Sequence, residues 1–293
     1  MAHVVKRRGA VALAVALGAC GGQSETPWWE QLGYAPEALQ PIRIGEYGYP
    51  FVEVSLQGET VWLPYDTGNM VGVTASSELF SQLELPCSSE WDQLDSGGQV
   101  VASGCTAHGV SVEWLGHAQD SVSVFEFFHE RLLGLIGPGS LPGSRFALDY
   151  ATGVFAVDYG RTPVSVEGFT AFPLVVSPRH PRLILVRGHV EGREVLIEID
   201  TGKSRTTIDR TLVGLLGLEE GPGGVALESV KLGSREWSVE AARIVDTSGI
   251  SEGLPSTIAL GVGSDVLSGF VFAVDYEAGR FYMADPDEVG GST

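Results

Sequence analysis

VWLPYDTG, residues 61–68, occurs a second time as VLIEIDTG, residues 195–202. Each copy is a short apolar run that ends in Asp-Thr-Gly. Gly58 lies eight residues before Asp66, and Gly192 lies eight residues before Asp200, each in a turn between two strand-like runs. A single Asp-Thr-Gly arises easily by chance. Two copies in register, each with a matching hairpin, indicate an internal duplication.

The segments that follow the two copies repeat as well. Helix-like runs are predicted at 77–83 and 210–216, with Ser76 or Ser77 and Asp209 as candidate N-caps. An apolar-apolar-Gly follows in each half, for which we match Leu135-Ile136-Gly137 with Ala259-Leu260-Gly261. The halves then end alike, in FALDYATGVF at 146–155 and FAVDYEAGRF at 272–281.

Composition is consistent with two β-rich lobes. The chain has 293 residues, enough for two lobes of about 100–150 residues, each with its own core. It contains 39 Gly and 15 Pro, and short alternating runs outnumber helical patterns, which predicts an all-β fold. The formal charge of −19 repels phosphate backbones, so no nucleic-acid partner is expected.

The N-terminus has the pattern of an export signal. Basic residues at 6–8 precede an apolar run at 10–19 that is too short to span a bilayer. The run ends in Leu-Gly-Ala-Cys20, which resembles the lipobox of bacterial lipoproteins. That resemblance implies a signal peptide at 1–19, a lipid on Cys20 and, from Gly21, the periplasmic face of the outer membrane. The Gly, Ser and Pro that follow, with the pair Trp28-Trp29, indicate a tether at 20–40. The alternative is an ordinary signal peptide with an incidental Cys.

The cysteine count agrees with export from the cytosol. If Cys20 carries lipid, Cys87 and Cys105 remain as a pair in an oxidising compartment, where a disulfide is expected and two buried thiols are the alternative. The sequence has no Cys-x-x-Cys or His-Glu-x-x-His, and its six His are scattered, so no metal site is predicted.

The order of these motifs resembles that of aspartic proteases of the retropepsin and pepsin type. The resemblance covers roughly residues 45–285. It implies two pseudo-symmetric β-barrel lobes in a pepsin-like bilobal arrangement, at 41–160 and 161–293. It also implies a catalytic pair of Asp66 and Asp200, no cofactor, a peptide or protein substrate and a monomeric enzyme.

The residue types suit this chemistry on their own account. Gly68 and Gly202 permit close approach of the opposite lobe, and the hydroxyls of Thr67 and Thr201 can both donate and accept across the two loops. Two adjacent carboxyl groups cannot both ionise, so they share one proton. The ionised group can deprotonate a water, while the protonated group can donate to the scissile carbonyl.

The first half is longer than the second. Asp66 to Gly116 spans 50 residues, whereas Asp200 to Gly233 spans 33. The extra residues fall where the family places its flap, with Ser96, Gly97 and Gly98 at a hairpin tip between the two cysteines. We assign these three to substrate binding. A surface loop without a role is the alternative, and the tip lacks the Tyr of pepsin-like flaps.

The residue after each Asp-Thr-Gly departs from the family, which favours Ala, Ser or Thr. Here the positions hold Asn69 and Lys203, which we also place at the substrate site. If the Lys203 ammonium reached the pair of aspartates, it would favour ionisation of both and suppress catalysis. Charged turn residues usually face solvent, so we expect Lys203 to point outward.

Three functions follow from these expectations. The first is a membrane-anchored aspartic endopeptidase. The second is a degenerate pair of lobes that binds peptide or a protein partner without cleaving it. The third is two independent lobes, each of which needs a second chain to complete its pair of aspartates.

Overall fold

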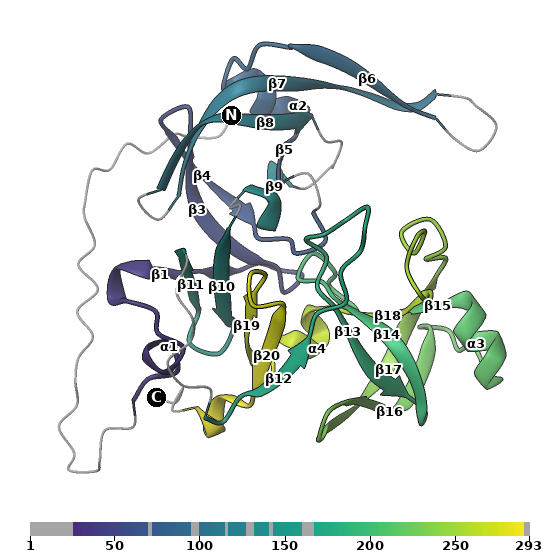
Figure 1. The fold of residues 1–293 in the computed structure, drawn as a ribbon. Helices are drawn as coiled ribbons and strands as arrows, with labels where there is room; N and C mark the ends of the chain where they lie inside the picture. Colours follow the sequence, from purple (N-terminus) through teal and green to yellow (C-terminus); the bar gives the residue numbers. More distant parts are fainter. Residues whose placement is uncertain are drawn as a thin grey trace.

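The computed structural model describes residues 26–69, 72–94, 100–114, 117–126, 132–140, 143–159 and 167–289. Within these ranges the chain is mostly β-strand, which confirms the all-β prediction. Figure 1 shows three bodies: an eight-stranded sheet at the top, a closed barrel at the lower right and a six-stranded sheet at the lower left. The expected boundary between the lobes, at residues 160 and 161, lies outside the described residues.

The eight-stranded sheet is built from the first half of the chain. Its strand order is β2-β3-β7-β8-β5-β9, with β4 paired to β3 and β6 paired to β7. The elements are β2 (Arg43–Ile44), β3 (Pro50–Leu56), β4 (Glu59–Pro64), β5 (Val73–Ala75), α2 (Ser77–Gln82), β6 (Ser89–Leu94), β7 (Val100–Trp114), β8 (His117–Glu126), β9 (Gly134–Ile136) and the 3-10 turn η2 (Pro138–Ser140).

The second half forms the closed barrel, in the order β13-β14-β18-β15-β17-β16. Its elements are β13 (Leu185–Val190), β14 (Arg193–Ile199), β15 (Thr207–Asp209), α3 (Arg210–Leu216), β16 (Val225–Leu232), β17 (Arg235–Val245), β18 (Ile258–Val262) and α4 (Ser264–Leu267). As predicted, α2 is capped by Ser76 and α3 by Asp209, whose side chains accept from the backbone N–H groups of Leu79 and Thr211.

The duplicated hairpins fold alike. β3 pairs with β4 and β13 pairs with β14, both antiparallel. Their turns have left-handed backbones at both central positions, with φ of 53° and 82° at Gln57-Gly58 and of 49° and 77° at Glu191-Gly192. Positive φ at both positions is the turn whose twist matches paired strands. Beyond the hairpins, β5 and β15 each pair with one parallel and one antiparallel neighbour.

The six-stranded sheet joins the two halves. Its order is β1-β11-β10-β19-β20-β12. In the central antiparallel pair Ala147 lies opposite Ala273, which is its counterpart in the repeated closing pattern. The register therefore places a local twofold axis between these two alanines. The strands are β1 (Leu39–Pro41), β10 (Ser144–Asp149), β11 (Val154–Tyr159), β12 (Thr170–Pro173), β19 (Val271–Asp275) and β20 (Arg280–Ala284), and the turn η3 (Pro286–Glu288) follows.

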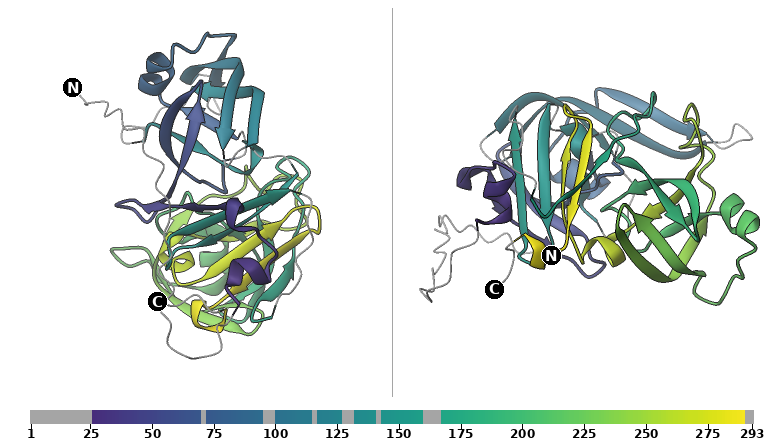
Figure 2. Two further views of the ribbon diagram at one scale, coloured as in Figure 1. Left: turned by 90° about the vertical axis from the view of Figure 1, so that its left-hand side faces the viewer. Right: turned by 60° about the horizontal axis from the view of Figure 1, so that its bottom comes forward.

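The expected tether at 20–40 is wrong for residues 26–40. Helix α1 (Trp28–Gln31) and turn η1 (Pro36–Ala38) pack against the six-stranded sheet, as Figure 2 shows, and β1 is the edge strand of that sheet. Trp28, Leu32 and Tyr34 are buried, and the Trp28 indole donates to Asp149 at 2.9 Å. Burial of large apolar side chains is favourable, and a linker in solvent would leave these side chains exposed to water.

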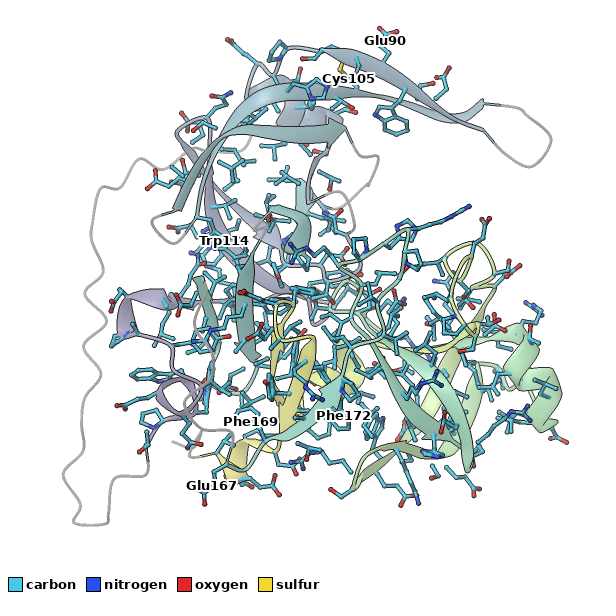
Figure 3. The ribbon with its side chains drawn as sticks, viewed as in Figure 1. Glu90, Cys105, Trp114, Glu167, Phe169 and Phe172 are labelled. Atoms are coloured by element: carbon cyan, nitrogen blue, oxygen red, sulfur yellow. A yellow bond between two sulfur atoms is a disulfide. The ribbon has the colours of Figure 1, made fainter. Side chains whose placement is uncertain are left out.

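The extra residues of the first half form a long hairpin. It consists of β6 and the first part of β7, and it projects from the eight-stranded sheet at the top of Figure 1. The predicted disulfide joins Cys87 to Cys105 at its base, with the two Cα atoms 5.6 Å apart, and Figure 3 shows it beside Glu90. The predicted tip residues Ser96, Gly97 and Gly98 lie outside the described residues, as does Cys20.

Candidate active site

Each Asp-Thr-Gly begins where a strand of the first hairpin of its half ends. The backbone N–H of Asp66 donates to the Ile136 carbonyl at 2.8 Å, and that of Asp200 donates to the Val262 carbonyl at 3.0 Å. Val262 is therefore the counterpart of Ile136, and the glycine that follows it is Gly263. The predicted match of Gly137 with Gly261 was therefore wrong by two residues. The apolar run of the second half holds a glycine at both 261 and 263, and the sequence pattern alone does not distinguish them.

An aromatic cluster holds the first loop against the six-stranded sheet. Tyr65, which precedes Asp66, is buried and packs on Trp114, Phe146 and Phe155 with ring centroids 4.7 to 5.5 Å apart. Trp114 stacks on Phe155 and lies between the two sheets in Figure 3. The strand end that carries Asp66 is thereby fixed in the core.

The two threonines bind each other's loops. The Thr67 N–H donates to Thr201 Oγ1 at 3.1 Å, and the Thr201 N–H donates to Thr67 Oγ1 at 3.0 Å. Each hydroxyl in turn donates to a carbonyl of the opposite strand end, Thr67 to Ile199 at 2.9 Å and Thr201 to Tyr65 at 2.5 Å. Thr67 and Thr201 are 2% and 0% exposed, so four buried hydrogen bonds lock the loops together.

The two glycines leave room for the opposite aspartate. A Cβ on Gly68 would lie 2.7 Å from Asp200 Oδ2, and a Cβ on Gly202 would lie closer than 3.0 Å to every atom of the Asp66 carboxyl group. Real Cβ atoms do not approach other atoms this closely. Any larger residue at either position would displace a carboxyl group.

Asp66 and Asp200 lie side by side. Their carboxyl groups are within hydrogen-bonding reach of each other, and each also accepts from the N–H of its own glycine, Gly68 at 2.8 Å and Gly202 at 2.9 Å. Burial and the neighbouring Asp200 charge raise the pKa of Asp66 to about 8. The two Asp-Thr-Gly loops of one chain meet each other, which does not fit the reading of two lobes that each need a second chain.

The prediction for Lys203 was wrong. Its ammonium turns inward, 2.9 Å from Asp200 Oδ2, and it also forms an ion pair with Glu198. Charged turn residues face solvent by default, but the buried Glu198 carboxylate gives this ammonium a partner. Asn69, at the matching position of the first loop, donates instead to the Gly72 carbonyl at 3.0 Å.

Glu198 is the site residue that the sequence reasoning missed. Its side chain is 4% exposed, and burial raises its pKa even though Lys203 opposes the shift. The signal was a glutamate inside the apolar run 195–199, every residue of which is buried. A buried carboxylate needs a cation or a proton.

Among the described residues, no group of three or more His, Cys, Asp or Glu is arranged to hold a metal ion. In that same part of the chain, no helix has the length and apolar character needed to span a bilayer. Neither protein-family models nor curated proteins give a match to this sequence.

Proposed function

We propose that the chain is an aspartic endopeptidase in which Asp66 and Asp200 act together on one water molecule. The observation that carries the proposal is the contact between the two carboxyl groups, each fitted against the glycine of the opposite loop. Adjacent carboxyl groups hold one proton between them, which provides an acid and a base in one place. The raised pKa of Asp66, about 8, keeps that proton in the pair at neutral pH.

The proposed reaction needs only these two groups and water. The carboxylate takes a proton from water, whose oxygen bonds to the peptide carbonyl carbon, while the other carboxyl gives its proton to the carbonyl oxygen. The tetrahedral intermediate then breaks its C–N bond. The amine leaves with the proton that came from water, and an intermediate hydroxyl returns its proton to the first donor, which restores the pair.

A binding protein without catalysis is the second candidate, because Lys203 contacts Asp200. A free ammonium there would favour ionisation of both aspartates. Here, however, Glu198 shares the ammonium, so the positive charge is already balanced by a buried carboxylate. Two aspartates then remain with one proton, which supports the catalytic candidate.

The wider setting of the proposal rests on sequence resemblance. We propose two retropepsin-like lobes that bind an extended peptide by strand addition, with the β6–β7 hairpin as a flap. The proposed location is the periplasmic face of the outer membrane, with the lipid on Cys20. A peptide or protein is the proposed substrate.

The test is cleavage of a peptide library by the purified protein, followed by mass spectrometry from acid to neutral pH. Asp66→Asn and Asp200→Asn are each expected to reduce cleavage by about 10²–10⁴-fold or more, because each removes one proton-transfer group. Asp246→Asn, at an exposed position, is the matched control and should cleave like wild type. A folded wild type that cleaves nothing would favour the binding protein.

A further inference from the structure

The second Asp-Thr-Gly loop has a charged neighbourhood that the first loop lacks. Lys203 Nζ contacts both Asp200 and Glu198, and the three side chains are 26%, 10% and 4% exposed. At the matching positions of the first loop stand Pro64 for Glu198 and Asn69 for Lys203. The ion pair therefore contacts one aspartate of the two, Asp200.

The barrel makes room for this pair. Gly261 of β18 lies directly across from Glu198 of β14 in the parallel ladder. A Cβ at Gly261 would lie 2.8 Å from Lys203 Nζ and 2.6 Å from Thr207 Oγ1. The matching residue of the first half, two positions before Gly137, is Leu135, which carries a side chain where the second half has none. The ion pair thus depends on the packing of strands β14 and β18 as well as on the turn that carries Lys203.

We infer that the Glu198–Lys203 pair makes the two aspartates unequal, with Asp200 held as the carboxylate that deprotonates water and Asp66 as the carboxyl that protonates the substrate. This inference rests on the proposed function. Lys203 lies against Asp200 and stabilises its negative charge, so the shared proton belongs on Asp66. Glu198 is a positioning residue, because it holds the ammonium in place and balances its charge without touching substrate.

The charges around the site agree with this assignment. Burial and the Asp200 carboxylate raise the pKa of Asp66, and Lys203 lowers it only in part. Burial alone would lower the pKa of Lys203, but Asp200 and Glu198 together raise it, so Lys203 stays charged. Two phenols interact with the aspartates, Tyr65 with Asp66 and Tyr150 with Asp200. Burial raises the pKa of both phenols, so they remain neutral.

Two substitutions should move the pH profile in opposite directions. Glu198→Gln leaves the Lys203 charge unbalanced and should shift the alkaline limb of kcat/KM to lower pH. The double variant Glu198→Gln/Lys203→Met removes the whole pair without leaving a buried unpaired charge, and should shift that limb to higher pH. We expect roughly one pH unit in each direction, the usual effect of a nearby charge. Lys203→Arg, which keeps the charge, should keep the wild-type limb.

The surface pair Lys231–Glu236 provides the matched control. Its two side chains are 44% and 49% exposed, and Glu236→Gln/Lys231→Met should leave the limb where it is. A retained activity whose limb is the same in wild type, Glu198→Gln and the double variant would overturn the inference. A merely structural role for the pair would lower activity without these opposed shifts.

A second measurement decides the inference even if no peptide is cleaved. The purified protein is labelled with ¹³C at the aspartate carboxyl carbon and titrated by NMR, with Asp66→Asn and Asp200→Asn assigning the two signals. We expect the Asp66 signal to titrate last, and the Asp200 signal to be that of a carboxylate across the neutral range. A proton found on Asp200 there would overturn the inference, whereas an inert protein with the proton on Asp66 would overturn only the proposed function.

Discussion

The two Asp-Thr-Gly loops share their backbone but differ in their charge. In both, the threonine binds the opposite loop and the glycine receives the opposite carboxyl group. Only the second loop is followed by a cation, and only its strand carries a buried glutamate. A duplicated pair of loops can therefore keep the geometry that joins its halves while the electrostatics of the two halves diverge.

The two halves also differ in what surrounds the loops. Strand β7 has 15 residues, whereas the matching β16 has 8, and only the first half adds β6 and a disulfide. The second half closes into a barrel without such a bridge. Matched substitutions in the two halves should therefore distinguish the effects of the geometry that both halves share from the effects of features that only one half has.

The largest effect is expected from Gly202→Ala. The new methyl group would occupy the place of the Asp66 carboxyl group, which must then move. A displacement of about 1 Å from reactive geometry can reduce activity by about 10²-fold, so we expect at least that loss in kcat/KM. Gly68→Ala, which crowds Asp200 in the same way, should also lose activity. Peptide cleavage and thermal unfolding are measured together.

Gly214→Ala is the control for these glycines. Gly214 lies in helix α3, and a Cβ there would meet no atom within 4 Å. Activity should be unchanged and stability should rise by up to about 1 kcal/mol, because alanine favours helix. Full activity in Gly202→Ala would contradict the opposed arrangement of the two loops.

The next effect comes from the disulfide, which only the first half has. Cys87→Ser/Cys105→Ser should lower the free energy of unfolding in urea by about 3 kcal/mol, since the bridge no longer restricts the unfolded chain. Hydrogen exchange should speed up in β6 and β7 and stay unchanged in β16 and β17. Equal acceleration in both hairpins would show that the bridge does not act locally. A reductant should have no effect on the double variant.

A smaller effect is expected from the threonines, which the halves share. Thr67→Val leaves the Thr201 N–H and the Ile199 carbonyl without their partners, and Thr201→Val does the same to the Thr67 N–H and the Tyr65 carbonyl. Each should lower the free energy of unfolding by about 1–3 kcal/mol, the penalty for unpaired buried polar groups. Serine at either position should restore most of it. A large loss at one threonine and none at the other would break the equivalence of the loops.

Much of the arrangement could be predicted from the sequence because it follows from local patterns. The paired hairpins, the caps at Ser76 and Asp209 and the bridge between Cys87 and Cys105 each depend on residue types with a strong structural preference. The duplication itself indicated which segments should match.

The rest depended on contacts distant in sequence. Lys203 turns inward because Glu198 is buried beside it and Gly261 leaves space, and neither condition is visible from the turn alone. Residues 26–40 were expected to be part of a tether, yet the Trp28 indole donates a hydrogen bond to Asp149, which is more than a hundred residues away in the sequence. General preferences were overridden in both places by tertiary packing.

Whether Asp66 and Asp200 share one proton is best tested by the pH dependence of unfolding, measured in wild type, Asp66→Asn, Asp200→Asn and the double variant. In the folded protein the pKa of Asp66 lies above the value of 3.8 for a free aspartate. Its contribution to the free energy of unfolding is therefore complete below about pH 4 and is lost as the pH rises through about 8. Wild-type stability should therefore fall across this window. Each single substitution should flatten the fall, and the double variant should add little to Asp66→Asn alone. Strictly additive changes, or a wild type with no fall, would mean that the two carboxyl groups ionise independently and form no pair.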